Sequence, residues 1–445
     1  MLFSYINNVF SELIKTYPDW DKLKNYLESD EGGLFRIVDH DETNHLVLIR
    51  YEKGVSNLDL PHSRWFRSVV WDTKNNLPVS ISPPKATHSE FPFNSLKDIT
   101  DNGVICEEFL DGFMINCFRI ANDNKLYISS RSKLNATGTF YSQKSFRTLF
   151  IEAYLGICDD SDAQREERIQ QNSSDIHLPD PSNGDHAVSY SFLVQHAEHR
   201  IVSNITKNRV FLIQKSTIYK NGDILITDHI ATFREGNNYV PIPLDFRSSR
   251  GTYAEIVRTH NDEVKEESIE SEVMQWLKML FDHRSWEFQG VVFKDRSGNR
   301  WRFRSEKYMA VKALRGNSPT SLERFAHLYT QNLTHLYLEY YPKDSFQFTF
   351  NTVCLTNIIQ LIYKYYIELN IKKSITLSEI DKMYHPHLYN LHGIFLSQLR
   401  PSGHKMSIAE IHKYFHKQPW QRIAFLIRKN QDAYFSNINN MMQPF

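Results

Sequence analysis

The sequence predicts an α+β fold, in which a domain of antiparallel sheets is followed by an all-helical C-terminal domain. Between Gly33 and about residue 145, β-branched and aromatic residues alternate with polar ones between Asn, Asp and Gly turns, a pattern typical of strands. Similar patterns return at 188–234 and 287–306, whereas Leu, Ile, Tyr and His recur at helical spacing after residue 319. The 445 residues suffice for two or three domains with separate cores.

The N-terminal half is expected to combine one helical segment with a long run of strands. The amphipathic pattern of MLFSYINNVFSELIKTYPDW predicts a helical segment over residues 1–32. The sheet domain then spans 33–316, with a helix expected over 142–157. Residues 159–186 are polar and weakly patterned, so we expect a loop or insert there.

The second half is expected to complete the sheet domain and then to become helical. Strand patterns lie at 188–195, 209–218, 224–228 and 230–234, a helix pattern lies at 263–283, and an RSGN turn joins EFQGVVFKD to RWRFRSE. We place the domain boundary near 316–320, where GNSP supplies turn residues, and assign 317–445 to the C-terminal domain. Residues 351–445 hold eleven Lys or Arg against five Asp or Glu, which indicates either an ordinary solvated surface or one that faces RNA.

Charge and cysteine content limit the class of protein. Lys+Arg and Asp+Glu both number 52, so the overall charge does not favour a general nucleic-acid coat and any anion site must be local. The four cysteines form no CxxC pair and are expected to be free thiols in a reducing compartment. No signal-peptide pattern and no apolar run of ~18 residues is present, so we expect a cytoplasmic protein without a membrane partner.

Several segments together carry a family resemblance. The first four are EEFLDGFMI (107–115), QHAEHRIV (195–202), QGVVFKD (289–295) and RWRFRSEKY (300–308). In this order they resemble the motif series of the T4-type RNA ligases, a family of nucleotidyltransferases, over roughly residues 60–316. With RSVVWD (67–72), SPPK (82–85) and LRGN (314–317), the chain resembles more closely the RNA-ligase-like proteins of asfarviruses and related large cytoplasmic DNA viruses.

The resemblance implies a nucleotidyltransferase domain whose two antiparallel sheets hold a nucleotide cleft. Such enzymes form a covalent lysyl-adenylate from ATP with Mg²⁺ and then join RNA ends. The helical C-terminal domain would grip a structured RNA such as tRNA, and no DNA-specific motif is recognised. The resemblance also implies the host cytoplasm, or packaging in the virion, as the location.

The position of the nucleophile departs from the family pattern. The lysine belongs at the first position of K-x-D-G, where this chain has Phe109, while Asp111 and Gly112 remain. Because no protonation state of a phenyl ring replaces an amine, the usual covalent step is excluded at this position. Asp111 stays a candidate catalytic residue.

The phosphate-binding cations implied by the family are better preserved. Candidate phosphate ligands are Arg67, Lys85, Arg131, Lys294, Arg302 and Arg304, of which Lys294 ends a strand and points at phosphate or at solvent. Positions 302 and 304 lie two apart on a strand, so their side chains point the same way. Arginine holds phosphate bidentately but cannot act as a nucleophile. The resemblance therefore implies an anion cradle without the covalent step.

The metal and ribose positions of the family are weaker. Gln289 stands where E-G-V-V has its glutamate, and Glu287, expected on the same strand face, is the substitute candidate for metal or ribose. Leu193 stands where the family has a ribose-binding glutamate, and Ser191 and Gln195 flank it on the same face. No metal site is assigned with these residues.

Lys85 is a candidate substitute nucleophile. It follows a strand that we expect beside the 107–115 segment, and the two prolines before it restrict the backbone. The same lysine could instead contact phosphate or lie on the surface.

Two functions of different classes remain open. One is an ATP-dependent RNA ligase that acts on RNA ends. The other is a catalytically inactive pseudo-ligase that binds RNA or nucleotide. A virion-associated structural protein built on the same scaffold is a third possibility.

Overall fold

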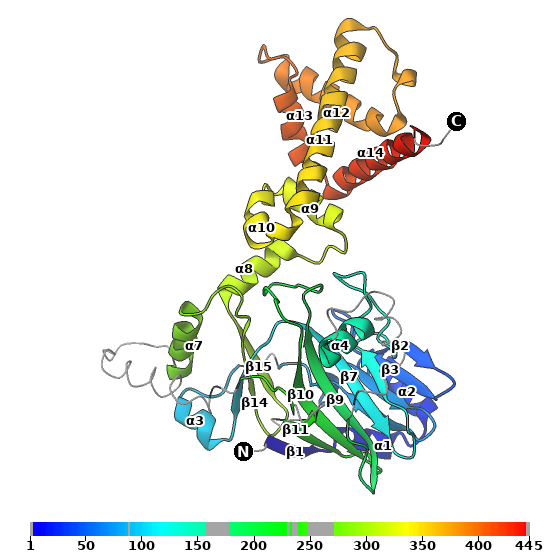
Figure 1. The fold of residues 1–445 in the computed structure, drawn as a ribbon, viewed down its shortest axis with the longest axis vertical. Coiled ribbons are helices and arrows are strands. Elements are labelled where there is room, and N and C mark those ends of the chain that lie inside the picture. Colours follow the sequence, from blue (N-terminus) through cyan, green and yellow to red (C-terminus); the bar gives the residue numbers. More distant parts are fainter. Residues whose placement is uncertain are drawn as a thin grey trace, which may run out of the picture. The chain divides into compact units, whose positions relative to one another are not determined.

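The fold is described from a computed structural model (Figure 1). It describes residues 3–87, 90–156, 176, 178–228, 232–233, 239–244, 246 and 271–441. The chain divides into two compact units, Met1–Met309 and Ala310–Phe445, each with buried apolar residues of its own. The division falls inside helix α8 (Glu306–Arg315), a few residues before the predicted boundary near 316–320.

A six-stranded antiparallel sheet forms the centre of the first unit (Figure 1). Its strands, in spatial order, are β1 (Phe3–Asn7), β11 (Ile224–Asp228), β10 (Arg209–Tyr219), β9 (Asp185–Gln195), β7 (Phe113–Ile120) and β8 (Tyr127–Ser130). Helix α4 (Phe146–Leu155) covers one face through a shared apolar cluster that includes Phe150 and Phe192. The helix predicted over 142–157 is confirmed over Phe146–Leu155.

The helical prediction for residues 1–32 is wrong at its start. Residues Phe3–Asn7 form β1, which pairs antiparallel with β11, before α1 (Val9–Thr16) and α2 (Trp20–Glu28). Burial alternates along β1, so the segment offers one apolar face to the sheet. Pairing with the backbone of β11, a partner more than 200 residues away, decides its conformation.

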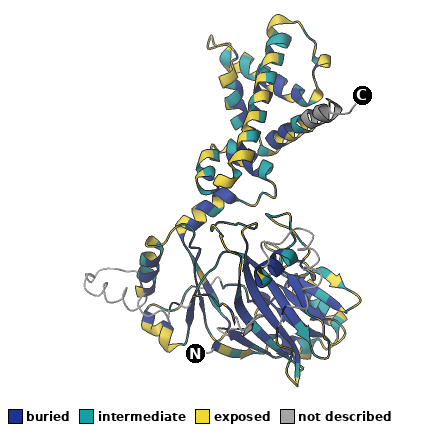
Figure 2. Ribbon diagram, viewed as in Figure 1, coloured by how far each residue is buried: buried dark blue, intermediate teal, exposed yellow. Residues whose placement is uncertain are grey.

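A four-stranded antiparallel sheet packs against the six-stranded one. It consists, in order, of β2 (Arg36–Asp41), β3 (Leu46–Arg50), β4 (Val69–Asp72) and β5 (Leu77–Ile81), with a 3-10 turn at Ser63–Trp65 before β4. All five residues of β5 are buried, and the Ser80 hydroxyl lies 2.8 Å from that of Ser189 on β9. Figure 2 shows the continuous buried region that these strands share.

A three-stranded antiparallel sheet has two faces of opposite character. It is formed, in order, by β15 (Arg300–Arg304), β14 (Gly290–Lys294) and β6 (Ile105–Glu108). One face, with Phe293 and Trp301, packs on α3 (Leu96–Asp101) and α7 (Glu272–Asp282). Because side chains alternate along a strand, the arginines of β15 lie on the other face.

The remaining elements of the first unit bear on two predictions. A two-stranded ribbon consists of β12 (Thr232–Phe233) and β13 (Tyr239–Val240). Most of the predicted insert at 159–186 lies outside the described residues. Residues 263–270 of the helix predicted over 263–283 also lie outside the described residues. Helix α7 covers the rest of that prediction from Glu272.

The second unit is helical in its described part, through residue 441, as predicted for the C-terminal domain. After α8, its α-helices are α9 (Ser321–Thr330), α10 (Thr334–Tyr340), α11 (Ser345–Tyr366), α12 (His385–Ile394), α13 (Ile408–His416) and α14 (Trp420–Met441). Short 3-10 or π-helical turns lie at Pro342–Asp344, Ile367–Lys372, Leu377–Glu379, Lys382–Tyr384 and Phe395–Leu399. None of the described helices has the length and apolar content needed to cross a bilayer.

Candidate phosphate-binding site

Five of the predicted cations gather in one place, next to the polar face of β15. Arg302 and Arg304 follow Arg300 along this strand at every second residue, so the three guanidinium groups share a face. Arg67 lies close to them: its burial, together with the charges of Arg300 and Arg131, lowers the pKa of its guanidinium to about 10. We call Arg67, Lys85, Arg131, Arg302 and Arg304 the cation cluster.

Tyr51 is the aromatic centre of one half of the cation cluster. Its ring is buried, and its amide donates to the Phe66 carbonyl at 2.8 Å directly after β3 ends. The Arg131 guanidinium lies 5.1 Å and the Lys85 ammonium 5.9 Å from the ring centroid. Such cation–π contacts stabilise positive charge where carboxylates are lacking. Tyr51 was not predicted from the sequence, where the tyrosine that ends HLVLIRY was the available signal.

The ring of Phe109 contacts the two arginines of the cluster that lie on β15. The guanidinium groups of Arg304 and Arg302 lie 5.2 and 5.9 Å from its ring centroid. Its amide donates to the Gly290 carbonyl at 2.9 Å, which ties the segment after β6 to β14. The place predicted for an attacking amine therefore contains a phenyl ring that contacts two arginines.

Lys85 belongs to the cluster through its backbone as well as its side chain. Its amide donates to the Arg64 carbonyl at 2.8 Å, and the Thr87 amide donates to the Arg300 carbonyl at 2.8 Å, so the segment runs beside β15. Burial, and then the charge of Arg302, lowers the pKa of the Lys85 ammonium. Lys85 is thus a half-buried member of the cluster and does not extend freely from the surface.

The four arginines of the cation cluster are not paired with described carboxylates. Arg67, Arg131, Arg302 and Arg304 form no ion pair with any acidic side chain in the described part of the chain. The Nε of Arg304 is buried and has no hydrogen-bond acceptor there. Grouped like charges repel one another and destabilise the fold. An anion bound between them would relieve this repulsion.

The prediction that Lys294 faces phosphate or solvent is wrong. Its ammonium is buried and lies 2.6 Å from Glu107 Oε2 and 2.9 Å from Asp228 Oδ2. Burial, and then the charge of Glu107, raises the pKa of Asp228 against the opposing effect of Lys294. A lysine that neutralises two buried carboxylates is held in place by them and is not available to a ligand phosphate.

Asp111 has a structural role in place of the predicted catalytic one. One carboxylate oxygen accepts the amides of Val202 and Ser203, both at 2.9 Å, and the other accepts the hydroxyl of Tyr308 at 2.9 Å. The side chain is buried. With both oxygens engaged, Asp111 fastens the loop after β9 and is not directed at a substrate.

Two motif glycines are explained by close strand contacts. A Cβ on Gly112 would lie 2.4 Å from the Val194 carbonyl oxygen, and one on Gly290 would lie 1.9 Å from that of Phe303. Both distances are far below van der Waals contact, so each position requires glycine while the strands keep their spacing. These glycines therefore have a packing reason that is independent of any ligand.

The predicted metal and ribose residues do not form a carboxylate site. Glu287 precedes β14, so it is not on the strand face predicted for it; its carboxylate accepts the Asn204 amide at 2.9 Å. Gln289 is buried and neutral. Leu193 is buried, and the side-chain amide of Gln195 donates to the Asp111 carbonyl.

The buried side chain of Ser191 also has a hydrogen-bond partner inside the core. Its hydroxyl donates to the Asn116 side chain at 2.8 Å. The Asn116 amide in turn donates to the Ser82 hydroxyl at 2.7 Å. The described candidates therefore offer no free set of carboxylates for Mg²⁺ next to the cation cluster.

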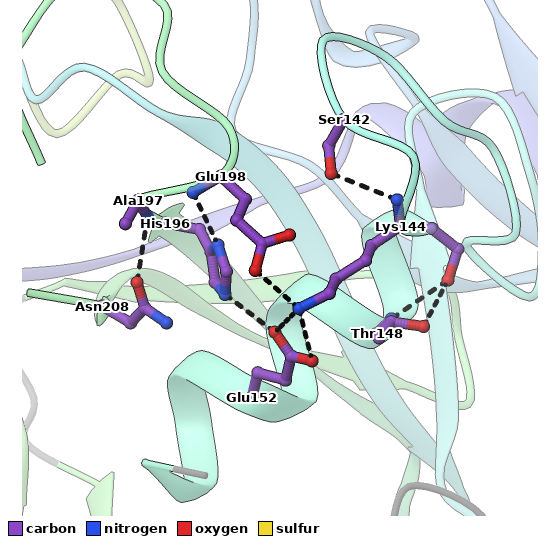
Figure 3. Close-up of polar contacts among 9 residues, drawn as sticks. Ser142, Lys144, Thr148, Glu152, His196, Ala197, Glu198 and Asn208 are labelled. Atoms are coloured by element: carbon purple, nitrogen blue, oxygen red, sulfur yellow. Dashed lines mark hydrogen bonds and ion pairs between the residues drawn. The ribbon is translucent and has the colours of Figure 1, made fainter. Parts of the chain in front are cut away.

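A second polar cluster anchors the loop that Asp111 holds (Figure 3). The Lys144 ammonium lies 3.0 Å from Glu152 Oε1 and 2.7 Å from Glu198 Oε1, and His196 Nε2 lies 3.0 Å from Glu152 Oε2. The Glu198 amide approaches His196 Nδ1 at 3.1 Å. Nδ1 is therefore the acceptor and Nε2 the donor.

This arrangement does not favour a metal at Glu152, His196 and Glu198, although their ligand atoms lie within 4.8 Å of one another. A metal on Nε2 would require the proton on Nδ1, where it would meet the Glu198 N–H. The Lys144 ammonium already supplies positive charge to both carboxylates. The cluster is best described as a hydrogen-bonded ion-pair network.

Known proteins show only a distant similarity to this chain. No family model matches the chain, and no curated protein matches it. Solved structures do match, among them one titled "Putative ATP-dependent DNA ligase from Aquifex aeolicus", with 12% identity and a TM-score of 0.27, over 85% of this chain and 80% of that chain. A TM-score this low does not establish a shared fold, so the function must follow from this chain's own residues.

Proposed function

We propose that this protein binds a phosphorylated nucleotide or RNA end, without forming a covalent intermediate, in the manner of an RNA-ligase-like pocket that lacks its nucleophile. The observation that carries the proposal is the cation cluster, whose members gather around Tyr51 and Phe109 with no described carboxylate to balance Arg67, Arg131, Arg302 or Arg304. Phosphate oxygens are the ligands that arginine forks bind best.

The aromatic rings extend the proposal from phosphate to nucleotide. Tyr51 and Phe109 lie among the cations, so a phosphate bound there would lie next to a ring. Nucleic-acid sites commonly combine cations for the backbone with rings for bases. RNA, including a structured one such as tRNA, is the class suggested by the sequence resemblance and is part of this proposal.

Binding by the cluster is tested with full-length protein and four labelled ligands: a 5′-phosphorylated RNA, the same RNA with a 5′-hydroxyl, ATP and adenosine. We expect the phosphorylated ligands to bind more tightly. Arg302→Gln and Arg304→Gln should each weaken that binding by about 10- to 100-fold, because charge-assisted hydrogen bonds contribute about 1.5–3 kcal/mol. Their thermal stability should be unchanged or higher, since like-charge repulsion is reduced.

Arg296→Gln is the matched control, because Arg296 is an exposed arginine in the turn before the same strand. It should leave binding unchanged. Equal affinity for phosphorylated and unphosphorylated ligands, or equal losses in all three variants, would contradict the proposal. Failure to bind any of these ligands at moderate salt would favour a structural role in a larger assembly.

A second candidate function is an ATP-dependent RNA ligase in which Lys85 is the nucleophile. The lowered pKa of Lys85 favours it, because attack needs the unprotonated amine. In such a step the Lys85 nitrogen forms a bond to the α-phosphorus of ATP, the bond to the pyrophosphate oxygen breaks, and the amine loses a proton. Lys294 is a poor alternative because two carboxylates hold its ammonium.

The two functions separate in one labelling experiment. Incubation with α-labelled ATP and Mg²⁺, followed by denaturation, should leave the protein unlabelled if binding is non-covalent. Label that is acid-labile, as a phosphoramidate is, and that disappears in Lys85→Arg would establish the ligase function and overturn the pseudo-ligase. The Arg variant keeps the positive charge, so it separates loss of the amine from loss of phosphate binding.

A further inference from the structure

Helix α14 presents a basic stripe with an aromatic ring at its centre. Its exposed side chains up to Gln431 are Gln421, Arg422, Phe425, Arg428 and Lys429, which we call the α14 stripe. At 100° per residue these positions fall within an arc of about 120° centred on Phe425. The opposite side of the helix, with Ile423 and Ile427, is buried in the second unit.

The α14 stripe combines one exposed aromatic ring with several cations. Phe425 is 47% exposed and is surrounded by three cations and one amide. Residues 408–431 contain five Lys or Arg and a single Glu. Arg428 is exposed and lies 3.6 Å from the partly buried Glu323, and a pair of this kind near the surface is worth about 1 kcal/mol. Arg422 bonds only to the neutral Gln418 among the described residues.

We propose that the α14 stripe binds single-stranded nucleic acid, with one unpaired base stacked on Phe425 and flanking phosphates on Arg422, Arg428 and Lys429. Arg422 and Lys429 are seven residues, or about 10 Å, apart along the helix, one on each side of the ring. A single exposed ring among cations fits a base and its neighbouring phosphates. A protein interface would instead have a wider apolar centre with lysine depleted.

The strand must be unpaired at the contact, because a base inside a duplex has no free face for the ring. RNA and DNA share the required chemistry, a charged backbone and a planar base. This inference does not depend on the cation cluster, which lies on the first unit, and the two can therefore fail separately.

The inference is tested with full-length protein and labelled homopolymeric RNA, the matching DNA, and a duplex of each. Phe425→Ala should weaken single-strand binding by roughly 5- to 100-fold, the range found when a stacking ring is removed. Arg422→Gln combined with Lys429→Gln should reduce the slope of log affinity against log salt by about 0.7 for each phosphate that is no longer bound. If the variants lose the same affinity for RNA and for DNA, the stripe recognises only the charged backbone and the base. If they lose affinity for RNA alone, the stripe also recognises the 2′-hydroxyl.

Phe346→Ala and Lys364→Gln on α11 are matched controls, since Phe346 is 82% exposed and Lys364 is exposed on the same unit. Both should bind normally, and all variants should keep the wild-type melting temperature because they change exposed positions. Unchanged affinity in Phe425→Ala, or equally tight binding of duplex, would overturn the inference. So would a monomer–dimer equilibrium that Phe425→Ala abolishes, because the stripe would then be an interface between copies of the chain.

Because the proposed function concerns the first unit, the Arg302→Gln variant is included in the same titrations. Loss of end-phosphate discrimination in Arg302→Gln with normal homopolymer binding would support both proposals independently. Loss of all homopolymer binding in Arg302→Gln and none in Phe425→Ala would overturn the stripe while leaving the cation cluster as the binding site.

Discussion

At the scale of single residues, Asp111 shows how a motif residue can serve the fold. Its carboxylate accepts hydrogen bonds from two consecutive amides of the loop after β9 and from the hydroxyl of Tyr308. Because this side chain is buried and bonded on both oxygens, it joins the loop after β9 and the start of α8 to its own segment of the first unit.

We expect Asp111→Asn to lower the free energy of unfolding of the first unit by about 2–4 kcal/mol, because an amide accepts through one oxygen only and turns an N–H toward other donors. Urea titration followed by tryptophan fluorescence would measure this change. Tyr308→Phe, which removes one of the three bonds, should cost about 1 kcal/mol. An Asn variant as stable as wild type would mean that the loop does not depend on this carboxylate.

At the scale of elements, the loop after β9 is held from two sides. Asp111 accepts the Val202 and Ser203 amides in the middle of the loop. At the start of the loop, Figure 3 shows the network in which Lys144 and His196 contact Glu152 of α4. Hydrogen bonds from His196 and Lys144 lower the pKa of Glu152 against the opposing effect of burial. The network therefore links α4, the segment before it and the end of β9 into one rigid support.

Removing the charge of Glu152 should loosen this loop locally. We expect Glu152→Gln to speed hydrogen exchange of the Val202 and Ser203 amides by about 5- to 100-fold, as loss of a hydrogen bond to a charged group costs about 1–3 kcal/mol. Exchange measured by NMR or mass spectrometry would detect it. Amides in β4 serve as the internal control, and uniform acceleration there would indicate global destabilisation instead of local opening.

At the scale of the whole molecule, each unit contains a buried histidine that is kept neutral. Burial lowers the pKa of His199 and of His387 to about 4. His199 lies among the rings of Phe113 and Phe146, and His387 lies 3.0 Å from the Tyr414 hydroxyl. Both units should therefore respond to acid through the same chemistry.

The pH dependence follows from the direction of these shifts. In the unfolded chain a histidine takes up a proton near pH 6.5, whereas in the folded chain these two resist protonation until about pH 4. Lowering the pH between these values favours the unfolded state, so we expect each histidine to cost about 2 kcal/mol of stability between pH 7 and pH 5. Calorimetry at both pH values would measure the loss.

Single substitutions assign the loss to each unit. His199→Phe should flatten the pH dependence of unfolding in the first unit and His387→Phe in the second, whatever their effect on stability at pH 7. A pH dependence between 5 and 7 that neither substitution reduces would show that other groups are responsible.

The pattern of residue types along the chain predicted those features that depend on neighbours in the sequence. Alternation along β15 predicted that residues 302 and 304 share a face, and the change to helical spacing predicted an all-helical second unit. The sequence alone shows that position 109 has no amine, and no conformation of the chain makes a phenyl ring a nucleophile. The phosphate-binding role of the cluster stays a prediction.

Other properties depended on partners that are distant in the sequence. Lys294 looked like a strand-end lysine, but Glu107 and Asp228 reach it from two other strands. The first strand formed where a helix was predicted, because β11 lies alongside it. Tyr51 could not be singled out from the sequence, because the cations that contact its ring, Lys85 and Arg131, belong to other segments of the chain.

The sequence by itself therefore determined the α+β class, the helical C-terminal part, the absence of the expected nucleophile and the supply of candidate cations. Only the tertiary structure decided which charges are paired: it engages Asp111 and Lys294 with buried partners and leaves Arg67, Arg131, Arg302 and Arg304 without described carboxylates. The physical reason is that residue type and spacing set local conformation, whereas the energy of a charge depends on burial and on neighbours that only the folded chain brings together.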